Sequence, residues 1–142
     1  NKMKIMICGS MTFASEMVDT KKKLEELGHS VQIPCDTETF VKDSNLIDNL
    51  DKDYEHCVEN EIMEKCFNLV AESDAVLVLN HHKNGINGYV GTSTLMEIGI
   101  ARHLGKKIFV LNDLPDYKQH RWAHEVRIMQ PVILNNDLEK VK

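Results

Sequence analysis

The distribution of apolar residues along the chain predicts strands that alternate with helices. Short apolar runs of strand length lie at residues 3–8, 74–79, 108–111 and 131–134, and residues 29–33, which end before a proline, supply a further strand. Between these runs, apolar residues recur at intervals of three and four with charged residues among them, which is typical of amphipathic helices. The run at 74–79 is almost purely apolar, the profile of a strand buried on both faces. This alternation predicts an α/β fold in three layers, with a doubly wound sheet of about five mostly parallel strands.

A short turn at Gly9 and Ser10 separates the first strand from an amphipathic helix that Gly28 ends. We predict Ser10 or Thr12 as the N-cap of that helix. Exposed amides at a helix start attract anions, so Gly9, Ser10 and Met11 are candidates for substrate contact. The chain has neither GxGxxG nor GxxxxGK[ST] at this turn, and a short connection alone also accounts for Gly9.

The stretch 85–101 follows the most apolar strand and combines a glycine-bearing loop with the start of a helix. Ligands of open α/β sheets bind where strands end and the following helices begin, which places Glu97 at the candidate site, on the first turn of its helix. A carboxylate beside the positive end of a helix is held ionised, as a nucleophile must be. Glu97 is therefore the candidate catalytic residue. Thr94 and Glu97 also match the capping box, so a purely structural role for Glu97 stays open.

The candidate substrate-binding residues share one location, at the carboxyl ends of strands or the helix starts that follow. They are Gly9, Ser10, Met11, Asp36, His81, Gly88, Tyr89, Gly91, Thr92, Ser93 and Asn112. The segment 43–61 is rich in Asp, Asn and Glu and poor in glycine. It is interpreted either as a mobile flap over this site or as a polar helix and loop.

Length, composition and charge describe one soluble domain over residues 1–142. The chain is 42% hydrophobic and 27% charged, as in ordinary globular proteins. Its net charge of −5 provides no basic surface for nucleic acid or anionic membranes. The apolar runs are too short to span a bilayer, and the N-terminal segment does not resemble a signal peptide. We therefore expect a cytoplasmic protein whose partner is a small molecule, with no nucleic acid and no membrane involved.

The four cysteines, at positions 8, 35, 57 and 66, show no CxxC spacing and lie in or beside apolar segments. This pattern favours reduced, mostly buried thiols over disulfides or a zinc site. Buried thiols are usually inert, so we predict no catalytic cysteine.

Four motifs, taken together, resemble the nucleoside 2-deoxyribosyltransferase superfamily, which includes the 2'-deoxynucleoside 5'-phosphate N-hydrolases. They are Cys-Gly-Ser at 8–10, Ser-Asp-Ala-Val-Leu-Val at 73–78, Gly-Tyr-Val-Gly at 88–91 and Met-Glu-Ile-Gly-Ile-Ala at 96–101. The resemblance covers most of the chain in order and spacing, and its most specific part is the helix start that carries Glu97.

The resemblance implies a flavodoxin-like sheet in the order 2-1-3-4-5 and assembly as homodimers or larger homo-oligomers with sites near subunit interfaces. It also implies cleavage of an N-glycosidic bond, with Glu97 attacking the anomeric carbon and no metal or organic cofactor. This is the two-step logic of retaining glycosidases, in which water or a second base then releases the sugar.

The chain departs from the pattern of this superfamily at three positions. Cys66 stands where members usually carry a second acid, and Met6 and Ile7 stand where they tend to carry an orienting tyrosine. Gly91 lies six residues before Glu97, where transferases tend to have Asp and nucleotide hydrolases Ser. The acid that protonates the leaving base is thus unassigned among four candidates, which are Asp36, Glu38, Glu64 and His81.

Two functions follow from this sequence. The first is cleavage or transfer at the N-glycosidic bond of a (deoxy)nucleoside or nucleoside 5'-monophosphate through a glycosyl-Glu97 intermediate. The alternative is a non-catalytic nucleotide-binding or sensing module that keeps the pocket but lacks a complete catalytic set.

Overall fold

A five-stranded parallel sheet in the order β2-β1-β3-β4-β5 forms the centre of the computed structural model, which describes residues 2–142. Its strands are β1 (Lys4–Gly9), β2 (Ser30–Gln32), β3 (Ala75–Leu79), β4 (Lys107–Val110) and β5 (Val132–Ile133). All four strand pairs are parallel, which confirms the α/β class and the strand order. The predicted apolar runs locate the strands, although the outer strands β2 and β5 are shorter than their runs.

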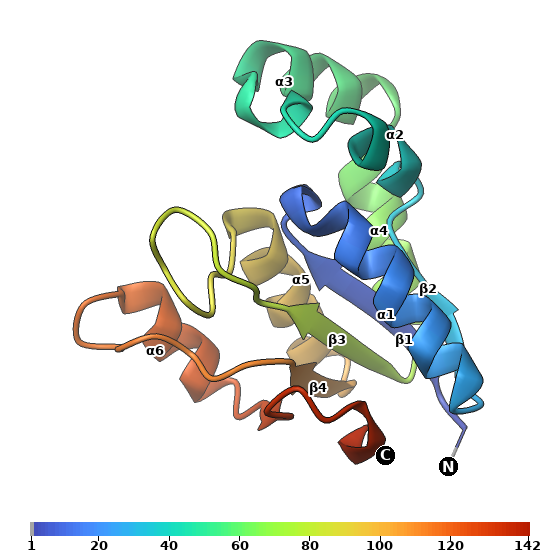
Figure 1. The fold of residues 1–142 in the computed structure, drawn as a ribbon, viewed down its shortest axis with the longest axis vertical. Helices are drawn as coiled ribbons and strands as arrows, with labels where there is room; N and C mark the ends of the chain where they lie inside the picture. Colours follow the sequence, from blue (N-terminus) through green and yellow to red (C-terminus); the bar gives the residue numbers. More distant parts are fainter. Residues whose placement is uncertain (1) are drawn as a thin grey trace.

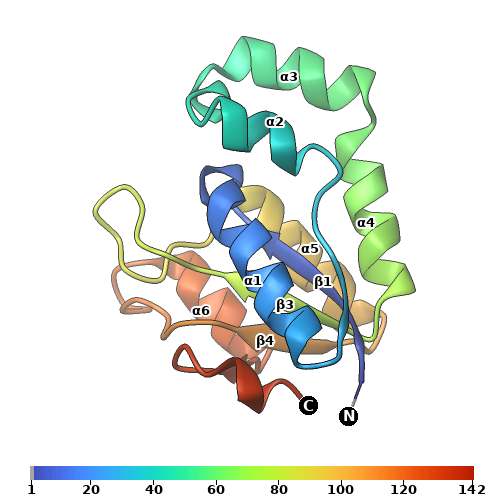
Figure 2. The same cartoon turned by 45° about the vertical axis from the view of Figure 1, so that its right-hand side comes forward.

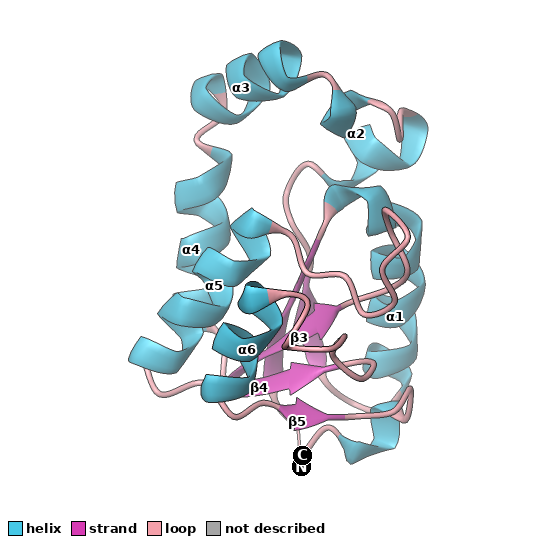
Figure 3. Ribbon diagram, turned by 90° about the vertical axis from the view of Figure 1, so that its left-hand side faces the viewer, coloured by secondary structure: helices cyan, strands magenta, loops and turns pink. Residues whose placement is uncertain are grey.

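Helices cover both faces of this sheet, α1 on one side and α4, α5 and α6 on the other (Figures 1 and 3). The helices are α1 (Ala14–Glu26), α2 (Thr37–Lys42), α3 (Leu50–Glu59), α4 (Ile62–Glu72), α5 (Thr92–His103) and α6 (Arg121–Ile128). Three short 3-10 turns are η1 (Met11–Phe13), η2 (Leu46–Asp48) and η3 (Leu138–Lys140). The predicted three-layer arrangement is therefore confirmed.

The period of two along β1 divides the core between the two faces of the sheet. Ile5 and Ile7 pack on the side of α1, whereas Met6 and Cys8 pack on the side of α4 and α5. Every residue of β3 is buried, as its apolar run predicts. Each fully buried aliphatic side chain contributes roughly 1.5–3 kcal/mol, so the central strands hold the layers together. Cys8 is thereby directed to the same face as α5.

The segment 37–59, made of α2, η2 and α3, stands apart from the three layers, above the carboxyl edge of the sheet (Figures 1 and 2). We call this segment the roof. Within the polar segment 43–61, the chain forms η2 and α3 joined by short loops, and it covers the cavity described below. Thr37 and Phe40 of α2 are buried, but α3 contains no fully buried residue. Leu50, Tyr54 and Val58 of α3 are exposed.

Helix α5 begins earlier than predicted, which moves Glu97 from the first turn of the helix to the second. Gly91 takes the extended N-cap conformation and the chain is already helical at Thr92. The capping box is therefore wrong, because Thr94 and Glu97 both lie inside the helix and no side chain caps its start. Both residues are buried instead. The N-terminal amides of α5 are left for a ligand or water.

Candidate active site

The main cavity of the described chain lies at the carboxyl ends of β1 and β3. Strand order reverses between these neighbours, because β1 leads to β2 on one side and β3 to β4 on the other. Such a switch point is where open α/β sheets bind their ligands. The cavity has a volume of about 370 Å³, walled by α4, α5 and the loop after β3, and covered by the roof. This volume is within the range of small-molecule sites.

Nine of the predicted site residues line this cavity together. They are Gly9, Ser10, Met11, Asp36, Tyr89, Gly91, Thr92, Ser93 and Glu97. They come from four separate parts of the chain: the turn after β1, the start of α2, the loop after β3 and the first two turns of α5. The expectation that strand ends and helix starts converge on one place is thus met by the fold.

Three predicted residues do not line the cavity. The His81 ring packs edge-on against Phe13, with centroids 5.3 Å apart. Gly88 has a φ of +79°, and a Cβ at this position would clash with the carbonyl oxygen of Asp113, so its glycine serves loop packing. Asn112 is held by its backbone N–H, which donates to Asn80 Oδ1 at 2.8 Å.

Asn80 is a structural residue that the sequence pattern did not reveal. It is fully buried directly after β3, and its Nδ2 donates to the carbonyl oxygen of Asn112 at 2.8 Å while Oδ1 accepts from the same residue. This reciprocal pair joins the ends of β3 and β4. A buried amide satisfied on both sides fixes the loop that follows β3, and this loop forms one wall of the cavity.

Glu97 is only 6% exposed, and among residues 2–142 no basic side chain forms a salt bridge with it. Burial raises the pKa of Glu97 to about 7, and a hydrogen bond from the Cys8 thiol partly opposes this. The expectation of a carboxylate held ionised by the helix start is therefore wrong. In the second turn, removal from water outweighs the helix terminus, whose influence falls off within one turn.

Two thiols, Cys8 and Cys66, lie beside the Glu97 carboxylate. Burial and the charge of Glu97 raise the pKa of Cys8 well above its usual value. Burial, then Glu97, then Asp36 raise the pKa of Cys66 to about 12. Both sulfurs therefore stay protonated near neutral pH, which makes them hydrogen-bond donors and poor nucleophiles. Sequence reasoning missed Cys8, although the period of two along β1 was the signal that places its side chain toward α5.

Of the four candidate acids, the structure brings one to the cavity. Asp36 lines it and is 7% exposed, with Oδ2 at 2.8 Å from Nε2 of His56. Glu38 and Glu64 are exposed and do not line it, and neither does His81. Asp53 on α3 also lines the cavity, and burial raises the pKa of its carboxyl.

Lys83 is the one Lys or Arg among the described residues that line the cavity. Its Nζ donates to Ser10 Oγ at 3.1 Å and lies 5.4 Å from the centre of the Tyr89 ring. Ser10 caps η1, because the backbone N–H of Thr12 donates to Ser10 Oγ at 3.3 Å. Helix α1, which follows η1 directly, begins after Phe13 with no side-chain cap, so Ser10 caps the turn that precedes the predicted helix. A cation, a hydroxyl and the uncapped amides of α5 thus face one region, the arrangement that binds phosphate.

Three further features of the described chain concern metal ligands, cysteines and membrane-spanning helices. No group of three or more His, Cys, Asp or Glu side chains within residues 2–142 is arranged to hold a metal ion. All four cysteines are free thiols, with Cys8 and Cys66 buried, Cys57 half-buried and Cys35 exposed. Over the same residues, no helix has both the length and the apolar character needed to cross a membrane.

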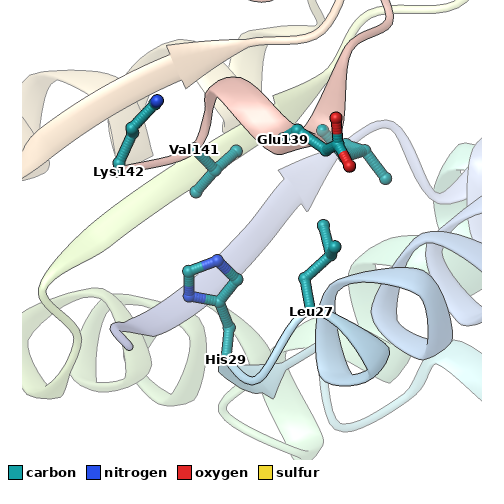
Figure 4. A pocket seen from close by; sticks show the side chains of 6 residues that line it. Leu27, His29, Glu139, Val141 and Lys142 are labelled. Carbon is teal, nitrogen blue, oxygen red and sulfur yellow. The ribbon is translucent and has the colours of Figure 1, made fainter. Parts of the chain in front are cut away.

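A second hollow, of about 260 Å³, lies far from Glu97, between Leu27 and His29 and the C-terminal segment 138–142 (Figure 4). Nδ1 of His29 accepts from the backbone N–H of Met3 at 3.1 Å, which ties this corner to the start of β1. The ring is thus already engaged in holding the fold.

The fold and the cavity define an open α/β domain with a buried carboxyl group at its switch point. No protein-family model and no curated protein matches the sequence. Among solved structures, the chain is similar to Clostridium botulinum CMP N-glycosidase, BcmB, with 18% sequence identity and a TM-score of 0.44. The alignment covers 92% of this chain and 84% of that one. A likeness of this degree says nothing about activity, so function has to come from the site itself.

Proposed function

We propose that this protein cleaves or transfers the N-glycosidic bond of a (deoxy)nucleoside or nucleoside 5'-monophosphate, with Glu97 as the nucleophile. The observation that carries the proposal is the Glu97 carboxyl group, buried in the wall of a small-molecule cavity and without a salt bridge to any basic side chain of residues 2–142. A charge that folding leaves uncompensated is costly unless the ligand supplies its partner. Departure of a nucleobase builds positive charge on the sugar, and this charge is the missing partner.

The reaction proceeds in the two steps of a retaining glycosidase. Glu97 attacks the anomeric carbon as the base departs, and water or a second base then displaces the glycosyl ester. The developing sugar cation lowers the pKa of a neighbouring carboxyl, which favours the ionised form when it is needed. Cys8 acts on the same group, because its neighbouring thiol lowers the pKa of the Glu97 carboxyl and so opposes part of the effect of burial. No metal or organic cofactor enters this scheme.

Lys83 and Ser10 support the 5'-monophosphate as the preferred form of the substrate. Their 3.1 Å hydrogen bond places a cation beside the turn that follows β1 and close to the start of α5. A phosphate dianion there would accept from Lys83 Nζ, Ser10 Oγ and the free amides of Thr92 and Ser93. Assembly as a homodimer or larger homo-oligomer and a cytoplasmic location stay predictions.

The alternative is a nucleotide-binding or sensing module without turnover. The specific observation in its favour is Cys66, whose protonated thiol with a pKa of about 12 is far too weak an acid to serve a leaving base. The two functions differ in one observable, which is the appearance of free base.

The test is chromatographic detection of free base after incubation with a panel of nucleosides and 5'-monophosphates, with and without an acceptor base. We expect release by the wild type and a loss on the order of 10⁴-fold in Glu97→Gln, which keeps the size of the side chain and removes the nucleophile. Acceptor dependence separates transfer from hydrolysis. Tight nucleotide binding with no release by the wild type would establish the binding module instead.

A further inference from the structure

We infer that Asp36 is the acid that protonates the leaving base, and that His56 is the residue that positions it. This inference rests on the proposed function. It assigns to the residue before α2 the role of an acid, which Cys66 on α4 does not fill. Its basis is the juxtaposition of a buried carboxyl group, an imidazole and the cavity that also contains Glu97.

The first observation is that the Asp36 side chain does not cap the helix that follows it. It is the N-cap residue of α2, where an aspartate ordinarily accepts from a backbone amide two or three residues further on. Its side chain makes no such bond. The Thr37 hydroxyl instead donates to the carbonyl oxygen of Pro34 at 2.6 Å, which holds the turn without help from Asp36. The carboxyl group is therefore free for another task.

The second observation is that only one oxygen of this carboxyl group has a partner. Oδ2 accepts from His56 Nε2 at 2.8 Å, whereas Oδ1 is buried with no hydrogen-bond partner among residues 2–142. The residue is 7% exposed and lines the cavity. A buried carboxyl oxygen without a partner costs free energy, which a ligand that binds against Asp36 at the cavity wall would recover by supplying the missing bond.

The third observation is that His56 is held in the orientation that serves Oδ2. Its Nδ1 lies 3.4 Å from Nδ2 of Asn60, an amide nitrogen that also donates to the His56 carbonyl oxygen at 2.8 Å. Accepting at Nδ1 leaves the hydrogen on Nε2, where it faces Asp36. The ring edge also packs on Phe40 of α2, with centroids 5.9 Å apart. Helices α2 and α3 therefore fix the ring from two sides.

The fourth observation is that Asp36 and Glu97 line the same cavity, together with Cys66. The charges of both carboxyl groups raise the pKa of the Cys66 thiol. A nucleophile for the sugar and an acid for the base must act on one bound substrate, because the base leaves as the nucleophile attacks the anomeric carbon.

The step conserves atoms and charge. In the form of the protein that reacts, the Asp36 carboxyl carries the proton on Oδ1 while Oδ2 accepts from His56. As the Glu97 oxygen bonds to the anomeric carbon, the C–N bond breaks, its electrons go to the base, and the base takes the proton from Oδ1. The Asp36 carboxylate then accepts a proton from the water or second base that attacks the anomeric carbon. This attack breaks the ester to Glu97 and restores the acid.

The test compares leaving groups. Asp36→Asn keeps an acceptor for His56 but has no proton to give. On the neutral-base nucleotides that the wild type cleaves, we expect kcat to fall about 10²- to 10⁴-fold. On nicotinamide mononucleotide or 7-methylguanosine 5'-monophosphate, whose cationic bases leave without a proton, we expect the loss to stay within about tenfold. His56→Gln, which acts only through Asp36, should show the same dependence at smaller amplitude.

Glu38→Gln and Glu64→Gln are matched controls, since both carboxyl groups are exposed and lie outside the cavity; neither should alter base release. An equal loss on both classes of substrate in Asp36→Asn overturns the inference and leaves the proposed function standing if Glu97→Gln remains inactive. The leaving-group pattern in Asp53→Asn instead would identify Asp53 as the acid. If the wild type releases no base at all, both proposals fail together.

Where the wild type accepts neither cationic nucleotide, rescue decides the question. Formate fills the space of the missing carboxyl group in Asp36→Ala, and we expect it to restore base release at least tenfold. A folded variant that formate does not rescue, checked by its thermal transition, contradicts the assignment.

Discussion

The two carboxyl groups that we assign to the reaction, Glu97 and Asp36, are held by opposite kinds of structure. Glu97 stands on α5, whose Ile98 and Ala101 are buried against the central strands. Asp36 directly precedes the roof, and its partner His56 stands on α3, which has no fully buried residue and presents Leu50 to solvent at 76% exposure. The difference teaches that the nucleophile is fixed by the core of the fold, whereas the group facing the base depends on a part with few buried contacts.

The largest effect we predict on stability sharpens this contrast with one chemical change in each region. Leu77→Ala in the fully buried β3 should cost about 2–5 kcal/mol in the free energy of unfolding, because it leaves a cavity in the core. Leu50→Ala on the roof should change it by less than about 0.5 kcal/mol. Urea unfolding of both variants measures the difference. Equal costs would show that the roof is part of the same packed core.

The next effect concerns the ionisation of Glu97. Its pKa of about 7 in the folded protein lies above the ordinary value of 4.5, so the folded state holds the extra proton between these pH values. Stability contributed by this group is therefore lost as pH rises from 4.5 through 7. Relative to the wild type, Glu97→Gln should gain on the order of 3 kcal/mol between pH 4.5 and pH 8.

Urea unfolding of both proteins at several pH values measures this gain, and all groups that titrate alike in both proteins cancel. In the wild type, kcat/KM for base release should rise with pH through about 7, because the nucleophile must be ionised. A constant difference in stability between wild type and Glu97→Gln would mean that burial does not perturb this carboxyl group.

A smaller effect is expected at Lys83, the cation of the cavity. Lys83→Ala should raise KM for 5'-monophosphates about 10- to 100-fold, because the phosphate loses one or two charge-assisted hydrogen bonds. It should leave nucleosides nearly unaffected. Steady-state kinetics on a matched nucleoside and nucleotide checks this, with Lys118→Ala, an exposed lysine outside the cavity, as the control. An equal rise in KM for the nucleoside and the nucleotide would show that Lys83 supports the loop after β3 and does not bind the phosphate.

The layers of the molecule could be predicted from sequence, but the roof of the site could not. Apolar runs locate β1 and β3 because burial on both faces leaves a strong signal in the chain. The turn at Ser10 and the cavity face of α5 follow from the rule that ligands gather at strand ends. His56 could not be predicted as a site residue, because it comes from a polar segment with no strand before it. Its role exists only through tertiary contacts with Phe40 and Asp36.

The two errors at Glu97 have one physical cause. The capping-box pattern placed the helix start at Thr94, whereas the extended Gly91 lets the helix begin at Thr92. A shift of one helical turn moved the carboxyl group away from the helix terminus and into the interior. Its ionisation is then governed by burial, which a local pattern does not report.

The most direct test of the central claim is to trap the glycosyl intermediate on Glu97. The nucleotide found to be turned over is prepared with fluorine at C2', which destabilises the sugar cation and slows release of the ester. The trapped protein is then digested for peptide mass spectrometry. The account predicts a mass increase equal to the fluorinated sugar phosphate, located on Glu97 and absent in Glu97→Gln. Base release accompanied by no adduct, or by an adduct on another residue, would contradict it.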